Sequence, residues 1–210
     1  MTILAIETTA AVASAAIWRD GAVAASLHAD AGLRHAETVL PLIQRLLQEQ
    51  ETALEEVDAF AVDIGPGSFT GVRIGVCIAN GLAYAGKKRV IGVNALQALC
   101  EPCSETGRPV CALIDARNGN AYAAVYQGGQ NIVAPCAVET EAFLAGVPAG
   151  ALFVGDAMAE RLGIAAALRY PEAAAVAALA ARNPASACDS VTPLYLRPSQ
   201  AERLRREAGK

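Results

Sequence analysis

The chain contains an internal repeat. Shifting the sequence by 108 positions without a gap places residues 5–21 over residues 113–129. The paired positions share an acid, an aromatic ring and a glycine: Glu7 with Asp115, Trp18 with Tyr126, and Gly21 with Gly129. The alternative to a true repeat is that two hairpins of an alanine-rich chain agree by chance. The shared acid, aromatic and glycine positions argue against chance. The repeat therefore predicts a duplicated structural unit.

Each copy has the pattern of three consecutive strands. The first strand ends in the carboxylate, a polar turn follows, and the second strand ends in the aromatic residue. Asp20-Gly21 is a strong hairpin turn, because glycine readily takes positive φ. The third strands are expected at residues 22–27 and 132–138.

Helical and strand-like patterns follow each copy. The stretch "HAETVLPLIQRLLQEQ" places its apolar residues on one stripe, which predicts an amphipathic helix. Further helices are expected at 94–103, 158–168 and 173–182, and strands at 57–64, 89–93 and 151–155. Strands in threes followed by helices, twice, predict an α/β fold of two related lobes, residues 1–103 and 104–210.

Composition restricts the classes of protein. The 210 residues are 54% apolar and 18% charged, which is enough apolar material for a sizeable core. The net charge of −4 gives no global basic field, so contact with RNA would be local or shared with a partner. The sequence shows neither a signal peptide nor a membrane span, so we expect a cytoplasmic protein whose six cysteines are free thiols.

The duplication resembles the actin, hexokinase and Hsp70-like superfamily, whose lobes have the ribonuclease H-like fold. In its nucleotide-using members, the carboxylate after the first strand and the adjoining turn hold phosphate between the lobes. The corresponding candidates for cofactor binding are Glu7, Thr8 and Thr9. Close approach of phosphate favours glycine, and this turn has none, which weakens a nucleotide site here.

The stretch "DIGPGSFTGVRIG", residues 63–75, has the glycines of a phosphate loop in the wrong arrangement. No lysine follows Gly71, and the spacing of Gly65, Gly67 and Gly71 does not fit a dinucleotide fingerprint. We instead expect a turn followed by a helix with Ser68 as its N-cap.

Small residues recur every four positions along that helix, at Gly71, Gly75, Ala79 and Ala83. Such a ridge lets another element approach the helix backbone closely. The partner element lies either in the same lobe or in another subunit, and we favour another subunit. In that case Gly75→Leu would break association and leave the lobe folded. The expected interface is Gly71, Val72, Arg73, Gly75, Val76, Ala79 and Ala83, with Val39 and Ile43 of the preceding helix.

Motifs along the whole chain make the resemblance more specific. "ILAIETT", "RHAETVLPLI", "VDAFAVDIGPGSFTGVRIG", "NALQALC", "ALIDARNGNAYAAVY" and "PLYLR" look like those of the bacterial TsaB family of tRNA threonylcarbamoyladenosine biosynthesis proteins. The block "GPGSFTGVRIG" discriminates best. The resemblance implies two actin-like lobes and a cytoplasmic partner protein that is not itself an enzyme.

The family works with the related catalytic subunit TsaD and the ATPase TsaE. Together they transfer threonylcarbamoyl from threonylcarbamoyl-adenylate to N6 of the adenosine 3′ of the anticodon. The resemblance implies pairing with TsaD, or with a second copy, through the helices of the N-terminal lobe. It also implies that the isolated chain has no cofactor and that any ATP or ADP binds at the interface with partners. Contact with tRNA is expected only through the complex.

The residues agree with the absence of a catalytic or metal site. TsaD-like enzymes bind metal through an H-x-x-x-H pair, whereas His28 and His35 are seven positions apart and Val39 follows four after His35. We expect a solvated or capping role for His35. Cys100 and Cys103 have redox spacing without the rest of a redox or zinc motif. The alternative function is a nucleotide-dependent transferase or metallopeptidase that acts on its own.

Overall fold

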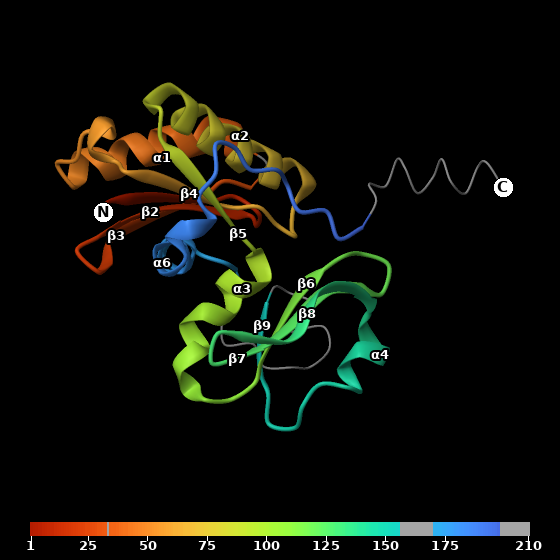
Figure 1. Cartoon of the computed structure of the whole chain (residues 1–210). Coiled ribbons are helices and arrows are strands. Elements are labelled where there is room, and N and C mark those ends of the chain that lie inside the picture. Colours follow the sequence, from red (N-terminus) through yellow and green to blue (C-terminus); the bar gives the residue numbers. More distant parts are fainter. Residues whose placement is uncertain (33, 156–169, 198–210) are drawn as a thin grey trace, which may run out of the picture.

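A computed structural model describes residues 1–32, 34–155 and 170–197, and it contains two β-sheets (Figure 1). The first sheet has the strand order β3-β2-β1-β4-β5. Strands β1 and β4 run parallel, as do β4 and β5, and the hairpins β1–β2 and β2–β3 are antiparallel. The strands are β1 Ile3–Glu7, β2 Val12–Arg19, β3 Ala22–Asp30, β4 Ala59–Asp63 and β5 Arg89–Val93.

The second sheet repeats this arrangement with one strand fewer, in the order β8-β7-β6-β9. Adding 108 to the bounds of β2 gives those of β7, so the structure follows the sequence repeat residue by residue. The predicted α/β fold of two related lobes is confirmed. The strands are β6 Val110–Asp115, β7 Asn120–Gln127, β8 Gln130–Glu139 and β9 Leu152–Gly155.

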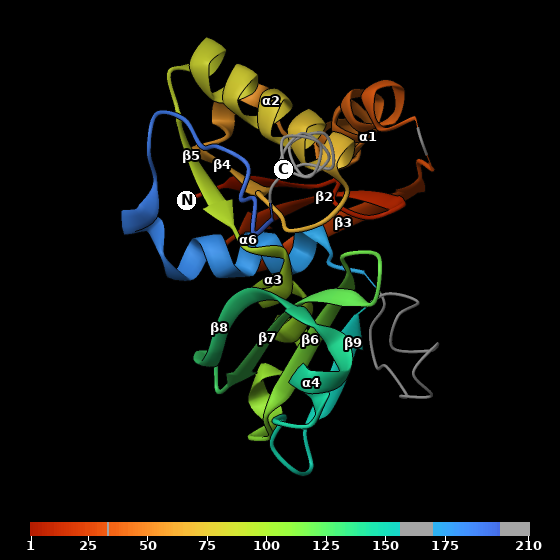
Figure 2. The same cartoon turned by 90° about the vertical axis from the view of Figure 1, so that its right-hand side faces the viewer.

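Helices cover both faces of the first sheet (Figure 2). Helices α1, His35–Glu49, and α2, Phe69–Gly86, pack on one face, and α6, Ala173–Arg182, packs on the other. Helix α6 comes from the second half of the sequence, and its Ala173 amide donates to Ser14 Oγ of β2 at 2.9 Å. The division at residues 103 and 104 stays a prediction.

The smaller helices belong to the second sheet. Helix α3, Ala95–Cys100, shares an apolar cluster with β6 and β7, and α4, Thr140–Leu144, follows β8. The helix predicted at residues 158–168 lies outside the described residues. In the parts of the chain that the structure describes, no helix is long and apolar enough to cross a membrane.

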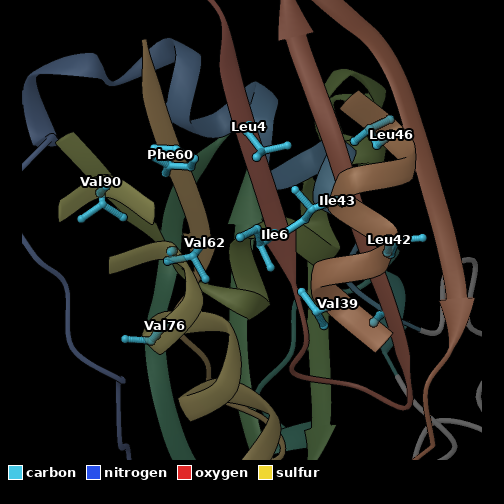
Figure 3. Close-up of a cluster of buried hydrophobic side chains, with 14 of the residues drawn as sticks. Leu4, Ile6, Val39, Leu42, Ile43, Leu46, Phe60, Val62, Val76 and Val90 are labelled. Carbon is cyan, nitrogen blue, oxygen red and sulfur yellow. The ribbon is translucent and has the colours of Figure 1, made fainter. Parts of the chain in front are cut away.

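The main core lies between the first sheet and the pair α1 and α2 (Figure 3). Strand residues alternate, so Leu4 and Ile6 of β1 face these helices while Ile3 and Ala5 face α6. The stripe of α1 supplies the opposite side of the core, which explains why its apolar residues recur with helical spacing. The stripe residues that are buried are Val39, Leu42, Ile43 and Leu46.

Two local predictions from the sequence are confirmed. Asp20 and Gly21 have φ values of 56° and 86°, as the hairpin turn requires. Ser68 is the N-cap of α2, and its Oγ accepts a hydrogen bond from the Gly71 amide at 3.2 Å. Strand β3 extends to Asp30, three residues beyond the predicted end, because Asp30 still pairs with Val12 of β2.

The structure corrects the prediction that the small-residue ridge of α2 lies open to a partner. A Cβ atom on Gly71 would lie 2.0 Å from the Thr8 carbonyl oxygen, and one on Gly75 would lie 2.3 Å from Thr8 Oγ1. The ridge therefore packs against the chain's own first sheet. Arg73 is the exposed member of the expected interface. The buried members are Val39, Ile43, Gly71, Val72, Gly75, Val76, Ala79 and Ala83.

We expect Gly71→Ala and Gly75→Leu each to lower the free energy of unfolding by about 2 kcal/mol or more, because the added atoms overlap Thr8. Gly81→Ala is the matched control in the same helix. A Cβ there meets nothing within 4 Å, so alanine should stabilise the helix by up to about 1 kcal/mol. Denaturant unfolding measures all three, and wild-type stability of Gly71→Ala would contradict the packing described.

Candidate functional site

A cavity of about 550 Å³ lies between the two lobes. Each copy of the repeat contributes the turn after its first strand, with Thr9 from the first lobe and Ala116 and Arg117 from the second. The beginnings of α1 and α2 complete the first lobe's wall, through His35 and Ser68. Its volume is within the usual range of small-molecule sites.

The second lobe's wall carries the charged groups of this cleft. Asp115 ends β6, and its Oδ1 accepts a hydrogen bond from the Arg117 amide at 2.8 Å. Arg117, Asn118 and Gly119 all have positive φ, so the chain turns tightly and leaves the Arg117 side chain exposed. The wall therefore presents a carboxylate and a guanidinium to one cavity, an arrangement suited to a small polar ligand.

The first lobe's wall is less suited to phosphate. Glu7 is fully buried, and its Oε1 accepts hydrogen bonds from the backbone amide and the hydroxyl of Thr9. A phosphate group bound at this turn would need such backbone amides. Of the three predicted cofactor residues, only Thr9 lines the cavity, and Glu7 and Thr8 lie behind it at 0% exposure. The fold thus brings the three together but presents only Thr9 to the cavity.

Sequence reasoning missed Asp63 as the neighbour of Glu7. Both residues end buried strands, and both are 0% exposed. Burial raises the pKa of Glu7 to about 7, against hydrogen bonds from Thr9 that lower it. Burial and then the charge of Glu7 raise the pKa of Asp63 well above its ordinary value. The sequence did contain a signal. The apolar strand "AFAVD" ends in the acid Asp63, just as "ILAIE" ends in Glu7.

His35 is buried, so of the predicted solvated or capping roles the solvated one is wrong. Its Nε2 lies 2.7 Å from the Ala10 carbonyl oxygen, so the ring fastens the cleft turn to the start of α1. His28 is exposed on β3. Among the residues that the structure describes, no group of three or more His, Cys, Asp or Glu side chains could hold a metal ion.

The six cysteines are free thiols, as expected from the sequence. Burial raises the pKa of Cys100 far above its ordinary value, and burial raises that of Cys111 to about 12. A thiol needs its thiolate form to attack a disulfide or to bind a metal. Burial therefore keeps Cys100 in its neutral thiol form at neutral pH.

The outer face of α2 is a second candidate site. Arg73 is the one charged residue between Phe69 and Gly86, although a surface helix ordinarily carries several charges on its outer side. The exposed residues of this face are Phe69, Thr70, Arg73, Cys77, Gly81, Tyr84 and Ala85, and Tyr84 is 88% exposed. On α1, Leu40 is 49% exposed.

An ordered cluster marks the N-terminal end of this face. The Arg73 guanidinium lies 3.7 Å above the centre of the Phe69 ring, and its Nε donates to Tyr195 Oη at 2.7 Å. Tyr195 arrives from the other end of the sequence. Its segment is held by two hydrogen bonds between Asn80 and Val191, of 2.9 and 3.0 Å. Arginine and aromatic side chains are the residue types that contribute most to binding in protein interfaces.

Comparison with known proteins gives consistent results. A protein-family model described as TsaD, tRNA N6-adenosine threonylcarbamoyltransferase, matches residues 28–183. The tRNA threonylcarbamoyladenosine biosynthesis protein TsaB of Escherichia coli is 41% identical over 133 residues, which are 62% of this chain and 57% of that protein. The protein of the same name from Bacillus subtilis is 32% identical over 127 residues, 60% of this chain and 56% of that protein. The chain thus spans little more than half the length of these curated relatives.

A solved structure covers much more of the chain. The crystal structure of an uncharacterized Pseudomonas aeruginosa protein with similarity to peptidase YeaZ has a TM-score of 0.81 and 29% sequence identity. The match covers 93% of this chain and 99% of that one. The two-lobed arrangement is therefore shared over nearly the full length described.

We expect His35→Ala to lower the free energy of unfolding by about 2 kcal/mol, because it removes a buried ring and leaves the Ala10 carbonyl oxygen without its partner. His28→Ala is the control, since that side chain is exposed and its removal should change stability by no more than about 0.5 kcal/mol. Urea unfolding of the two variants compares them, and equal stabilities would contradict a structural role for His35.

Proposed function

Because this chain belongs to the TsaD, tRNA N6-adenosine threonylcarbamoyltransferase family, we propose that it is an accessory subunit in the formation of N6-threonylcarbamoyladenosine on tRNA. It supports a TsaD-like catalytic subunit, which transfers threonylcarbamoyl from threonylcarbamoyl-adenylate to the adenosine 3′ of the anticodon. A TsaE-like ATPase completes the system. The proteins named TsaB for this pathway, among the relatives of this chain, support the proposal.

The single observation that carries the accessory role is the state of the cleft turn. The backbone amide and the hydroxyl of Thr9 both donate to the buried carboxylate of Glu7, which takes the place that a phosphate group would need. An independent transferase needs a phosphate-binding turn, and an independent metallopeptidase needs a group of metal ligands. The described residues offer neither in complete form. We therefore propose that the isolated chain uses no cofactor, and that any ATP or ADP binds at an interface with its partners.

Reconstitution tests this function. We expect modified adenosine to form on a tRNA transcript when TsaD, TsaE, threonylcarbamoyl-adenylate, ATP and this chain are combined. Omission of the chain should reduce the yield at least about tenfold, and the chain without TsaD should give none. Nucleoside analysis by mass spectrometry measures the product. Product from the chain alone would favour the alternative of an independent enzyme, and product without the chain would overturn the proposal.

We further propose that the outer face of α2 is the surface that binds the TsaD-like subunit. This face is nearly uncharged, and exposed apolar residues would be covered on association. The cluster of Phe69, Arg73 and Tyr195 is already ordered, so little side-chain entropy is lost when it is buried. In the absence of TsaD, the same face would pair two copies of this chain.

The proposal also specifies the cellular setting. The protein acts in the cytoplasm, where it contacts tRNA only as part of the complex. Its net charge of −4 agrees with this, since electrostatic attraction to the phosphate backbone then has to come from partner subunits.

Cys77→Arg tests the proposed surface, because it places a charge in the middle of the uncharged outer face. We expect at least about a tenfold weaker association with the TsaD-like subunit and little change in unfolding, since Cys77 is exposed. Gln130→Arg, at an exposed position of β8 in the second lobe, is the control and should bind as wild type does.

Co-sedimentation of the purified proteins measures both variants. Unchanged affinity of Cys77→Arg for TsaD would refute this surface. Loss of self-association with retained TsaD binding would show that the face serves only the homodimer, and it would also refute the proposal.

A further inference from the structure

Two carboxyl groups lie next to each other inside the first lobe. Strands β1 and β4 are parallel, with Ile6 opposite Val62, so Glu7 and Asp63 follow as neighbours at the ends of the two strands. Adjacent strands lie about 4.8 Å apart. Both side chains point to the face that α6 covers, because they alternate with the residues facing α1 and α2. Each is 0% exposed.

Each carboxyl group has one satisfied and one unsatisfied oxygen. Glu7 Oε1 accepts from the Thr9 amide and from Thr9 Oγ1, both at 2.5 Å, and Asp63 Oδ1 accepts from the Gly65 amide at 2.7 Å. Among the residues that the structure describes, neither Glu7 Oε2 nor Asp63 Oδ2 has a hydrogen-bond partner. Buried acceptors without a donor are costly and uncommon. A single proton on either carboxyl group would satisfy both oxygens through one O–H···O hydrogen bond.

In the described part of the chain, the residues opposite the two carboxyl groups on the neighbouring strands carry no positive charge. Ser14 of β2 lies opposite Glu7, and its hydroxyl accepts the Ala173 amide of α6. Val93 of β5 lies opposite Asp63.

The titratable groups on the neighbouring helices are engaged elsewhere or exposed. Helix α6 faces the sheet with alanines, and its Glu172 cap is exposed. His35 of α1 is engaged with the Ala10 carbonyl oxygen, and Arg73 of α2 binds Tyr195. Among the described residues, none of the ion pairs and hydrogen bonds given for either carboxyl involves Lys or Arg.

We propose that Glu7 and Asp63 share one proton at neutral pH, and that this carboxyl–carboxylate hydrogen bond joins β1 to β4 directly behind the cleft turn. Thr9 connects the pair to the cleft, because it donates to Glu7 and also lines the cavity. Loss of the proton would bring two negative charges together without water. The position of the cleft turn therefore depends on the protonation of this pair.

The sign of the pH dependence follows from proton binding. Burial raises the pKa of both groups, and that of Glu7 to about 7, whereas carboxyl groups of an unfolded chain titrate near pH 4. Between these values the folded chain holds a proton that the unfolded chain has lost. The contribution of this pair to the free energy of unfolding should therefore be complete below about pH 4. It should be lost as the pH rises through about 7.

Asp63→Asn is the test variant. Its amide oxygen can still accept from Gly65, and its amide nitrogen can donate permanently to Glu7 Oε2, so the proton is no longer needed. We expect the fall in Tm between pH 5 and pH 8 to be clearly smaller than in wild type. Glu7→Gln should behave likewise. Asp20→Asn, at the exposed hairpin turn, removes a carboxylate that is not buried and should keep the wild-type slope.

Infrared difference spectroscopy of the wild-type chain provides a measurement that does not depend on any variant folding. A protonated, poorly hydrated carboxyl band should be present at pH 6 and pH 7, and it should weaken as the pH rises further and the pair loses its protons. Absence of that band, or equal Tm slopes for wild type and Asp63→Asn, would overturn the proposal. Stabilisation of the wild-type chain by Mg²⁺ at pH 6 without that band would also overturn it, since a cation would then occupy the proton's place.

Discussion

The contact between α2 and the end of β1 organises this molecule. Thr8 Oγ1 donates to the Gly71 carbonyl oxygen at 2.8 Å. The Thr8 backbone occupies the space that a side chain at Gly71 would fill, and the Thr8 hydroxyl occupies that at Gly75. One turn earlier, the Ser68 amide donates to the Thr9 carbonyl oxygen at 2.8 Å. The helix is thereby fixed in height, direction and rotation against the sheet. Its beginning forms a wall of the cleft, and its outer face becomes the surface of the lobe.

The orientation of α2 about its own axis decides which of its residues a partner can reach. Because the smallest residues face the sheet, the aromatic rings and Arg73 face outward, where Tyr195 joins them from the other end of the chain. A surface assembled from residues more than a hundred positions apart exists only in the folded chain. Association through this surface would therefore depend on correct folding of the first lobe and on the docking of segment 187–197. This segment pairs with the first sheet through an antiparallel backbone bridge between Cys188 and Val90 of β5.

The two copies of the repeat have diverged at the same structural position. In the first copy, Glu7 is buried beneath the turn and accepts from the Thr9 amide. In the second copy, Asp115 lines the cavity and binds the Arg117 amide. Helix α6 covers the face of the first sheet to which Glu7 points. Equivalent acids thus differ in what they can contact.

The sequence by itself determined the duplication, the order of strands and helices, the cap at Ser68, and the resemblance to the TsaB family that the comparisons bear out. These features depend on local periodicity, turn chemistry and self-similarity, which are visible in one dimension. The side of α2 that faces inward was decided only by tertiary structure, because a ridge of small residues permits close approach equally to a sheet of its own lobe or to another subunit. The pairing of Glu7 with Asp63 was also out of reach, since parallel strands bring together residues 56 positions apart without any local pattern. The same holds for α6, whose alanines match the first sheet although the sequence places them in the second half of the chain.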